Sequence, residues 1–284
     1  MHVTKITVQT LDVSLLRKGQ GHKYDHGHAL VLTGGAGRTG AARLAARGAL
    51  RIGAGAVTLA VPPAAQFEVA AQITAVMLKR VANAADLTTL LKDRRISAVC
   101  LGPGLGTDAR AEDVVKAALP AAHVVLDADA LTLLAKDETL RAALHSGCVL
   151  TPHGGEFARL AADLADTAKE NRTDAKAEAA RLAALRFGCV VLLKGAETVI
   201  AAPDGSVLRH RALDDQAVPW LATAGAGDVL AGFITGLLAR GIAPMQAAAW
   251  ATCLHAEAAR QYGPGLIAED LPEMLPQVLR QLGV

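Results

Sequence analysis

Short aliphatic runs recur along the first two thirds of the chain, and each is followed by a glycine-rich turn and a helical pattern. The apolar residues in these runs are continuous, which is typical of strands that are buried on both faces of a parallel sheet. Their alternation with helices predicts βαβ units and a doubly wound sheet. The predicted strands cover residues 28–34, 56–62, 96–102, 123–128, 147–152 and 189–195.

The pattern changes after Lys194. Residues 198–212 alternate in polarity around a Pro-Asp-Gly turn, which predicts a β-hairpin. Helices are predicted over residues 40–53, 109–119, 166–186, 227–239, 245–261 and 272–282. Because no low-complexity linker and no internal repeat divides the 284 residues, we expect a single α/β/α domain over residues 1–284.

Charge and aromatic content argue against a nucleic-acid partner. The formal net charge is +2, no long basic run occurs, and aromatic residues make up 3% of the chain. Nucleic-acid binders need a basic footprint, and single-stranded nucleic acid also needs aromatic stacking platforms. A local basic pocket for a small phosphate-bearing molecule remains compatible with this balance.

Cysteine usage and hydropathy predict a soluble cytoplasmic protein. None of the four cysteines has metal-ligand spacing, and three lie in strand-like apolar runs, so we expect buried free thiols, which suit a reducing compartment. The first residues lack the apolar core of a secretory signal. No uninterrupted apolar run of bilayer length occurs, so we expect no membrane span.

A first glycine cluster, Gly35, Gly37 and Gly40, has the G-x-G-x-x-G spacing between a predicted strand and helix. That spacing suggests a dinucleotide fingerprint, which also needs an acidic residue near the end of the next strand. No Asp or Glu occurs between Asp25 and Glu68, so a hydride-transferring NAD enzyme is disfavoured. An anionic or amide-bearing ligand at the helix start and tight strand–helix packing without a ligand both remain open.

A second cluster of small residues, 224–227, leads into a predicted helix and is followed by Asp228. Free N–H groups at a helix start can hold a phosphoryl group during its transfer. A carboxylate beside them can accept the proton of an attacking hydroxyl. The structural alternative is an Asp placed favourably near the positive end of a helix dipole.

Other polar residues have two interpretations each. His153 follows a predicted strand, where it could face a ligand crevice or serve as a structural hydrogen-bonding group. Glu156 could place a metal or water, or simply favour a helix start. Lys194 ends a buried strand, where it needs solvent or a phosphate. His255 lies on an Ala-rich helix and is interpreted as a packed core or interface residue.

These motifs, taken in order, resemble the ADP- or ATP-dependent NAD(P)H-hydrate dehydratases of the ribokinase-like superfamily. The resemblance covers nearly the whole chain and includes "LGPGLG", "LDADAL", "LTPHGGEFARL", "LLKGAETVI" and "LATAGAGDVLAGFITGLLARG". It implies a three-layer ribokinase-like fold with a largely parallel central sheet. It also implies a carbon–oxygen lyase that phosphorylates the ring hydroxyl of hydrated NADH or NADPH and eliminates phosphate.

The resemblance assigns roles to individual positions. Asp228 matches the base, and Gly225 and Gly227 match the anion hole. The positions implied for the nucleotide are Lys194, Gly195, Ala196, Glu197, Thr198 and Gly227. The positions implied for the hydrated dinucleotide are Ala41, Gly104, Gly106, His153 and Asp228. Asp127 and Asp129 lie in a family-like motif after a strand and are weaker candidates.

The resemblance further implies ADP or ATP as co-substrate, Mg²⁺ on the nucleotide phosphates, and a homo-oligomer for which a tetramer is the family's suggestion. We expect no epimerase domain within residues 1–284. The chain departs from the family pattern at Gly154, at Ala224 and in residues 216–220, where an Asn-bearing turn is missing. Metal ligands are not assigned.

Two other functions remain open at this point. A ribokinase-like kinase for a sugar, vitamin or thiazole would share Asp228 and the anion hole but would release a stable phosphorylated product. A nucleotide sensor without catalysis would not need the Asp228 carboxylate.

Overall fold

A computed structural model describes residues 1–169, 174–213 and 216–284. One ten-stranded sheet runs through it in the order β1-β10-β9-β8-β7-β6-β5-β2-β3-β4. The strands are β1 (Thr4–Lys5), β2 (His28–Leu32), β3 (Ala56–Val61), β4 (Met77–Arg80), β5 (Ile96–Leu101), β6 (Val124–Leu126), β7 (Cys148–Leu150), β8 (Val190–Leu193), β9 (Glu197–Ala201) and β10 (Val207–Arg211).

The six predicted strands are all present and lie in the parallel part of the sheet, which β4 extends by pairing parallel with β3. Strands β8, β7, β6, β5, β2 and β3 lie side by side with parallel pairing throughout. The predicted hairpin is β9 and β10, which pair antiparallel to each other, and β9 also pairs antiparallel with β8. Every residue of β2, β3, β6, β7 and β8 is buried, as continuous apolar runs require.

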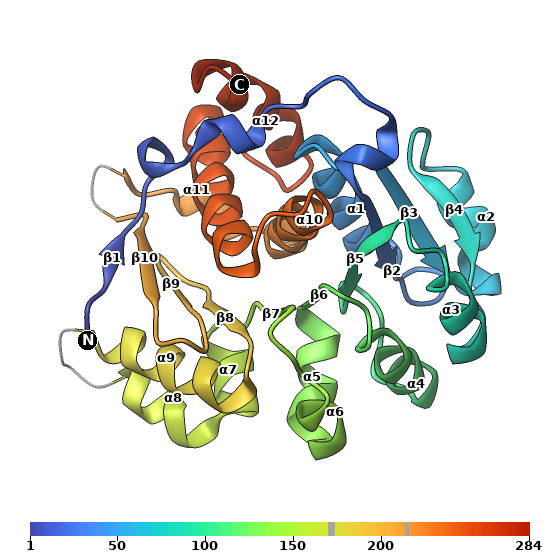
Figure 1. Cartoon of the computed structure of the whole chain (residues 1–284), viewed down its shortest axis with the longest axis horizontal. Coiled ribbons are helices and arrows are strands. Elements are labelled where there is room, and N and C mark those ends of the chain that lie inside the picture. Colours follow the sequence, from blue (N-terminus) through green and yellow to red (C-terminus); the bar gives the residue numbers. More distant parts are fainter. Residues whose placement is uncertain (170–173, 214–215) are drawn as a thin grey trace.

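Helices cover both faces of this sheet (Figure 1). They are α1 (Gly40–Arg51), α2 (Gln66–Ala70), α3 (Ala84–Leu90), α4 (Ala109–Ala118), α5 (Ala128–Lys136), α6 (Glu138–Ala142), α7 (Gly154–Leu160), α8 (Ala162–Lys169), α9 (Ala175–Phe187), α10 (Ala226–Ala239), α11 (Pro244–Tyr262) and α12 (Asp270–Gln281). Figure 1 shows α1, α10, α11 and α12 above the sheet and α3 to α9 below it. Each face has its own apolar cluster, which confirms the three-layer prediction.

Two parts of the prediction needed correction. The single helix predicted over 166–186 is α8 and α9; Asp174 has a left-handed φ of 69°, which interrupts a helix, and residues 170–173 lie outside the described part. Strands β1 and β4 were not predicted. They lie at the two edges of the sheet, and neither has a continuous apolar run: β1 is an exposed Thr-Lys pair, and the Met-Leu-Lys-Arg sequence of β4 is partly exposed.

Small residues let α1 and α10 approach closely. A methyl group built on Gly232 of α10 would lie 2.1 Å from the carbonyl oxygen of Ala45, and one on Gly236 would lie 2.2 Å from Cγ2 of Ile52. This contact fixes the middle of α10 against α1. Within the described ranges, no helix is both long and apolar enough to cross a bilayer.

We predict that Gly232→Ala lowers the free energy of unfolding by about 1–3 kcal/mol, because the added methyl group would overlap the Ala45 backbone. Urea denaturation measures this loss. Gly19→Ala is the matched control, since nothing lies within 4 Å of a methyl group there, and it should change stability by less than about 0.5 kcal/mol. Equal effects of the two substitutions would contradict the close-packing argument.

Candidate active site

The start of α10 is built around a glycine that no other residue could replace. Gly225 is the residue before the helix and has a left-handed φ of 89°. A methyl group on it would lie 2.6 Å from Cδ1 of Leu44 and 2.8 Å from Cβ of Ala268. The glycine therefore fixes the turn that brings Asp228 into the first turn of α10, where backbone N–H groups have no partner within the helix.

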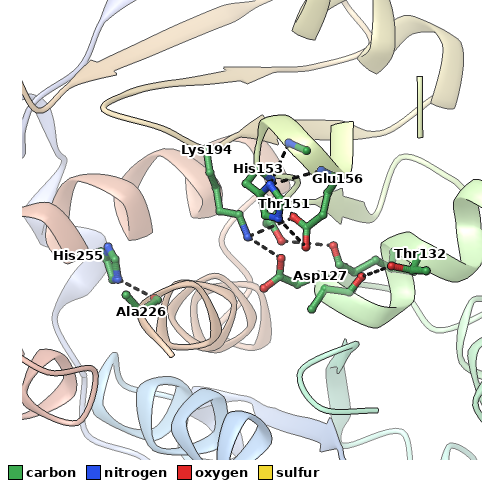
Figure 2. A network of polar contacts seen from close by, with 11 residues as sticks. Asp127, Thr132, Thr151, His153, Glu156, Lys194, Ala226 and His255 are labelled. Carbon is green, nitrogen blue, oxygen red and sulfur yellow. Dashed lines mark hydrogen bonds and ion pairs between the residues drawn. The ribbon is translucent and has the colours of Figure 1, made fainter. Parts of the chain in front are cut away.

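Three neighbouring parallel strands end in charged side chains that point toward one another (Figure 2). Asp127 follows β6, Glu156 lies in the first turn of the helix after β7, and Lys194 follows β8. Nζ of Lys194 lies 2.8 Å from Oδ1 of Asp127 and 3.8 Å from Oε2 of Glu156. Because the carboxyl ends of parallel strands meet at one sheet edge, the fold gathers these groups from distant parts of the sequence.

Gly227 faces this cluster from α10. A methyl group on Gly227 would lie 3.4 Å from Nζ of Lys194 and 4.0 Å from Oδ2 of Asp127. The absence of a side chain leaves the first turn of α10 open to the ammonium group, so an anion there can contact both backbone N–H groups and Lys194.

The pKa of Asp228 is raised to about 7, chiefly by its burial and next by the negative charge of Asp127. The positive charge of Lys194 opposes this rise, whereas Asp129 and Glu156 add to it. A carboxyl group with this pKa exchanges a proton readily at neutral pH, which suits a general base.

His153 has a defined structural role. Its Nδ1 accepts hydrogen bonds from the backbone N–H groups of Gly155, at 3.0 Å, and Glu156, at 3.4 Å. Glu156 in turn accepts a bond of 2.8 Å from the His153 N–H, so the two residues form a capping box at the start of α7. The His153 side chain is 56% exposed, and its Nε2 lies 3.5 Å from Oε1 of Glu156.

A cavity of about 490 Å³ opens beside Lys194, within the size range of small-molecule sites. It brings together five of the positions that the sequence resemblance implies for a nucleotide: Lys194, Gly195, Ala196, Thr198 and Gly227. The side chain of Glu197 is not among its lining residues; its carboxylate lies 3.5 Å from Nε of Arg209 and 3.6 Å from Nε of Arg211.

The opposite walls of this cavity come from α11 and from the turn that departs from the family pattern. Ala217, Val218 and Pro219 line it, so an apolar wall stands where a polar Asn was expected. His255 also lines it, and burial lowers its pKa to about 4. The neutral ring donates from Nε2 to the Ala226 carbonyl, 2.9 Å away, which confirms a packed core histidine.

A second group of predicted positions gathers where two glycine-rich loops touch. One loop contains the first glycine cluster, residues 35–40, and the other has the sequence LGPGLG, residues 101–106. A methyl group on Gly104 would lie 2.2 Å from the Arg38 carbonyl oxygen and 3.7 Å from Cβ of Ala41. The Gly106 N–H donates to Oδ2 of Asp129 at 2.8 Å. Ala41, Gly104 and Gly106 therefore lie together, next to the aspartates that follow β6.

Asp127 and Asp129 are more central than the sequence indicated. Asp127 is 2% exposed, and a methyl group on Gly102 would lie 1.7 Å from its carbonyl oxygen. The next residue, Ala128, has a left-handed φ of 45°, a strained conformation for a residue with a side chain. The signal that the sequence lacks is the backbone strain at Ala128 beside the buried carboxylate of Asp127. Only the three-dimensional structure reveals such strain.

Glu68 is a functional candidate that the sequence interpretation missed. Its carboxylate accepts a 2.6 Å hydrogen bond from the Gly37 N–H and a short one from the Thr39 hydroxyl. These bonds, the Thr39 hydroxyl first, lower the pKa of Glu68. The first glycine loop is therefore held by a carboxylate of this chain, so its Gly37 N–H is not available to an external anion.

The comparisons with known proteins agree with this geometry. Residues 29–279 match the model of the NAD(P)H-hydrate dehydratase family, and the chain belongs to that family. It is 42% identical, over 94% of its length, to the bifunctional NAD(P)H-hydrate repair enzyme Nnr of Moorella thermoacetica. It spans 52% of that relative's length.

Two further relatives match over nearly their full length. The ADP-dependent (S)-NAD(P)H-hydrate dehydratase of Xanthomonas campestris is 33% identical over 99% of this chain and 97% of its own. The ADP/ATP-dependent NAD(P)H-hydrate dehydratase of Bacillus subtilis, co-crystallised with ATP and Mg²⁺, is 29% identical. It superposes with a TM-score of 0.79 over 99% of both chains, which confirms the predicted ribokinase-like fold.

We predict that Lys194→Met lowers the free energy of unfolding by about 3–5 kcal/mol near pH 8, because Asp127 would be left buried and unpaired. The double variant Lys194→Met/Asp127→Asn should recover much of the loss. Lys116→Met, which breaks an exposed pair with Glu112, is the control and should cost less than about 1 kcal/mol. Stability is measured by urea denaturation. A Lys194→Met variant with the same free energy of unfolding as wild type would contradict the prediction.

Proposed function

We propose that this protein dehydrates hydrated NADH and NADPH at the expense of ADP or ATP and so restores the reduced dinucleotide. The observation that carries the proposal is Asp228: a carboxyl group in the first turn of α10, with a pKa of about 7 that the charge of Lys194 influences, and next in the chain to Gly227, which lines the 490 Å³ cavity together with Lys194. Family membership supplies the substrate class.

Hydroxide is a poor leaving group at neutral pH, so the hydroxyl of the hydrated ring must first be phosphorylated. In the proposed reaction, Asp228 accepts the hydroxyl proton while the hydroxyl oxygen bonds to the terminal phosphorus of the nucleotide. The bond from that phosphorus to the bridging oxygen breaks, and AMP or ADP leaves. The N–H groups at Gly225 and Gly227 hold the negative charge that develops on the transferred group.

Elimination follows on the phosphorylated ring. The lone pair of the ring nitrogen assists breakage of the carbon–oxygen bond, and inorganic phosphate leaves with the electron pair. Loss of a proton from the adjacent ring carbon then restores the double bond. No oxidant is needed, because the ring of the hydrate is already at the oxidation level of the reduced dinucleotide.

The nucleotide would occupy the cavity lined by Lys194, Gly195, Ala196 and Thr198, with its phosphates toward Lys194 and Gly227. Two observations support this placement: the open backbone at Gly227 and the ammonium group 3.4 Å from a methyl group built there. Glu197 would contribute through its backbone, since its carboxylate lies beside Arg209 and Arg211.

The residues at this end of the cavity suit a magnesium ion that the nucleotide brings with it. Within the described ranges, no three His, Cys, Asp or Glu side chains gather closely enough to hold a metal by themselves. Magnesium in such enzymes is usually held by one or two carboxylates and the substrate phosphates. Asp127 and Glu156, next to Lys194, would supply the carboxylate oxygens, and the ion would screen the phosphate charge.

The hydrated dinucleotide would lie between Ala41, Gly104 and Gly106, with its ring at Asp228 and the exposed side chain of His153 at the edge of the site. Contacts between the glycine loops support this arrangement.

The four free cysteines are buried, which agrees with the reducing cytoplasm that we propose as the compartment. We also propose a homo-oligomer, a tetramer by family likeness. Light scattering of the purified protein measures that state.

The decisive experiment incubates the protein with Mg²⁺, hydrated NADH or NADPH, and either ADP or ATP. We expect absorbance of the reduced nicotinamide to return together with stoichiometric phosphate and AMP or ADP. A stable phosphorylated product without recovery of absorbance would point instead to a small-molecule kinase. No turnover with either nucleotide would exclude the proposed activity.

The pKa of Asp228 gives a pH profile. Since the base acts when deprotonated, kcat/KM should rise about tenfold per pH unit below pH 7 and level off above it.

Asp228→Asn should lower kcat by about a hundredfold to ten-thousandfold. Nucleotide binding, measured by calorimetry, should remain, and its loss together with kcat would indicate a structural role for Asp228.

A further inference from the structure

We infer that Arg38 binds the pyrophosphate of the hydrated dinucleotide and thereby holds the substrate against Asp228. This inference rests on the proposed function and adds a residue that the sequence interpretation did not assign. It starts from the position of Arg38 in the first glycine loop, two residues before α1.

Arg38 lies at the contact between the two glycine loops. Its carbonyl oxygen would be 2.2 Å from a methyl group on Gly104, and its Nη1 would be 3.1 Å from one on Gly106. Backbone and guanidinium group thus lie over the two glycines that line the proposed dinucleotide site. Because neither glycine has a side chain, a phosphate can approach the guanidinium group closely.

The guanidinium group of Arg38 has no hydrogen-bond or ion-pair partner among the described residues. Arg38 is exposed, and in the part of the chain that the structure describes no carboxylate lies within ion-pair distance of it. Neighbouring arginines differ in this respect: Nη1 of Arg43 donates to Gln72, and Nε of Arg47 lies 2.7 Å from Glu273. A planar, permanently charged group without a partner is suited to bidentate phosphate binding.

The site needs such a cation on its substrate side. Asp228 feels the negative charges of Asp127, Asp129 and Glu156, and Lys194 is the cation that opposes them. A pyrophosphate dianion entering this field is repelled unless a second positive charge lies near its path. Arg38 is placed for that, since the Gly106 beneath it is hydrogen-bonded to Asp129.

Two hydrogen-bond donors of the first glycine loop are not available for this role. Glu68 already accepts bonds from the Gly37 N–H and the Thr39 hydroxyl. The same bonds fix the loop on which Arg38 stands. Asp129, whose charge acts on Asp228, accepts a hydrogen bond from the Gly106 N–H, and Gly106 lies under the Arg38 guanidinium group, so Arg38 is on the same side of the site as these carboxylates.

The test compares wild type, Arg38→Gln and Arg38→Lys on hydrated NADH, hydrated NADPH and hydrated reduced nicotinamide riboside, which has no phosphate. For Arg38→Gln we expect KM for both dinucleotides to rise about tenfold to a hundredfold with kcat nearly unchanged, since the pyrophosphate does not change during the reaction. The riboside and ADP should be used as by wild type, and Arg38→Lys should fall between. Arg47→Gln, on an exposed ion pair of α1, is the matched control.

Three results would overturn the inference. If KM rises equally for the riboside, Arg38 only maintains the loop. If KM rises for hydrated NADPH alone, Arg38 contacts the 2′-phosphate. If KM does not rise for any substrate, Arg38 is not part of the site. Calorimetric binding of hydrated NADH without nucleotide provides a readout that does not require turnover. If the wild type has no activity but binds hydrated NADH more tightly than Arg38→Gln does, the proposed function is rejected and this inference stands. If the wild type is active and Arg38→Gln behaves in the same way, this inference is rejected and the proposed function stands.

Discussion

The ion pair between Lys194 and Asp127 is the interaction on which the site depends. Asp127 is nearly inaccessible, so its charge is tolerable only because Nζ of Lys194 lies 2.8 Å away. The same ammonium group also faces Glu156 and the open first turn of α10. One cation therefore stabilises a buried carboxylate, limits the rise in the pKa of Asp228 and marks the end of the nucleotide cavity.

Glycines determine how closely the parts of this site approach one another. Gly102 lies against the Asp127 carbonyl, Gly104 against the Arg38 carbonyl, and Gly225 against Leu44 and Ala268. In each case a single methyl group would collide with a neighbour. The absence of a side chain at these glycines thus lets the loops and helix starts around the candidate site approach one another closely.

Much of the architecture could be predicted from the chain. Continuous apolar runs located the six parallel strands, and the alternation around Pro-Asp-Gly located the hairpin of β9 and β10. Strand β4 and the break at Asp174 could not be predicted, since an edge strand carries no apolar signature and a left-handed residue has no distinctive spacing. For the site, the spacing around Asp228 was informative, whereas Glu68 and Arg38 were not distinguishable from ordinary surface charges.

The sequence by itself determined the class of fold and the family, because these depend on local patterns: apolar runs, glycine turns and an aspartate at a helix start. The tertiary structure alone decided which charges face each other. Asp127 and Lys194 follow separate strands, Glu156 comes from the start of α7, and Glu68 reaches the first glycine loop from α2. Electrostatic interaction depends on distance through space, and only the folded sheet brings groups that are far apart along the chain within a few ångströms.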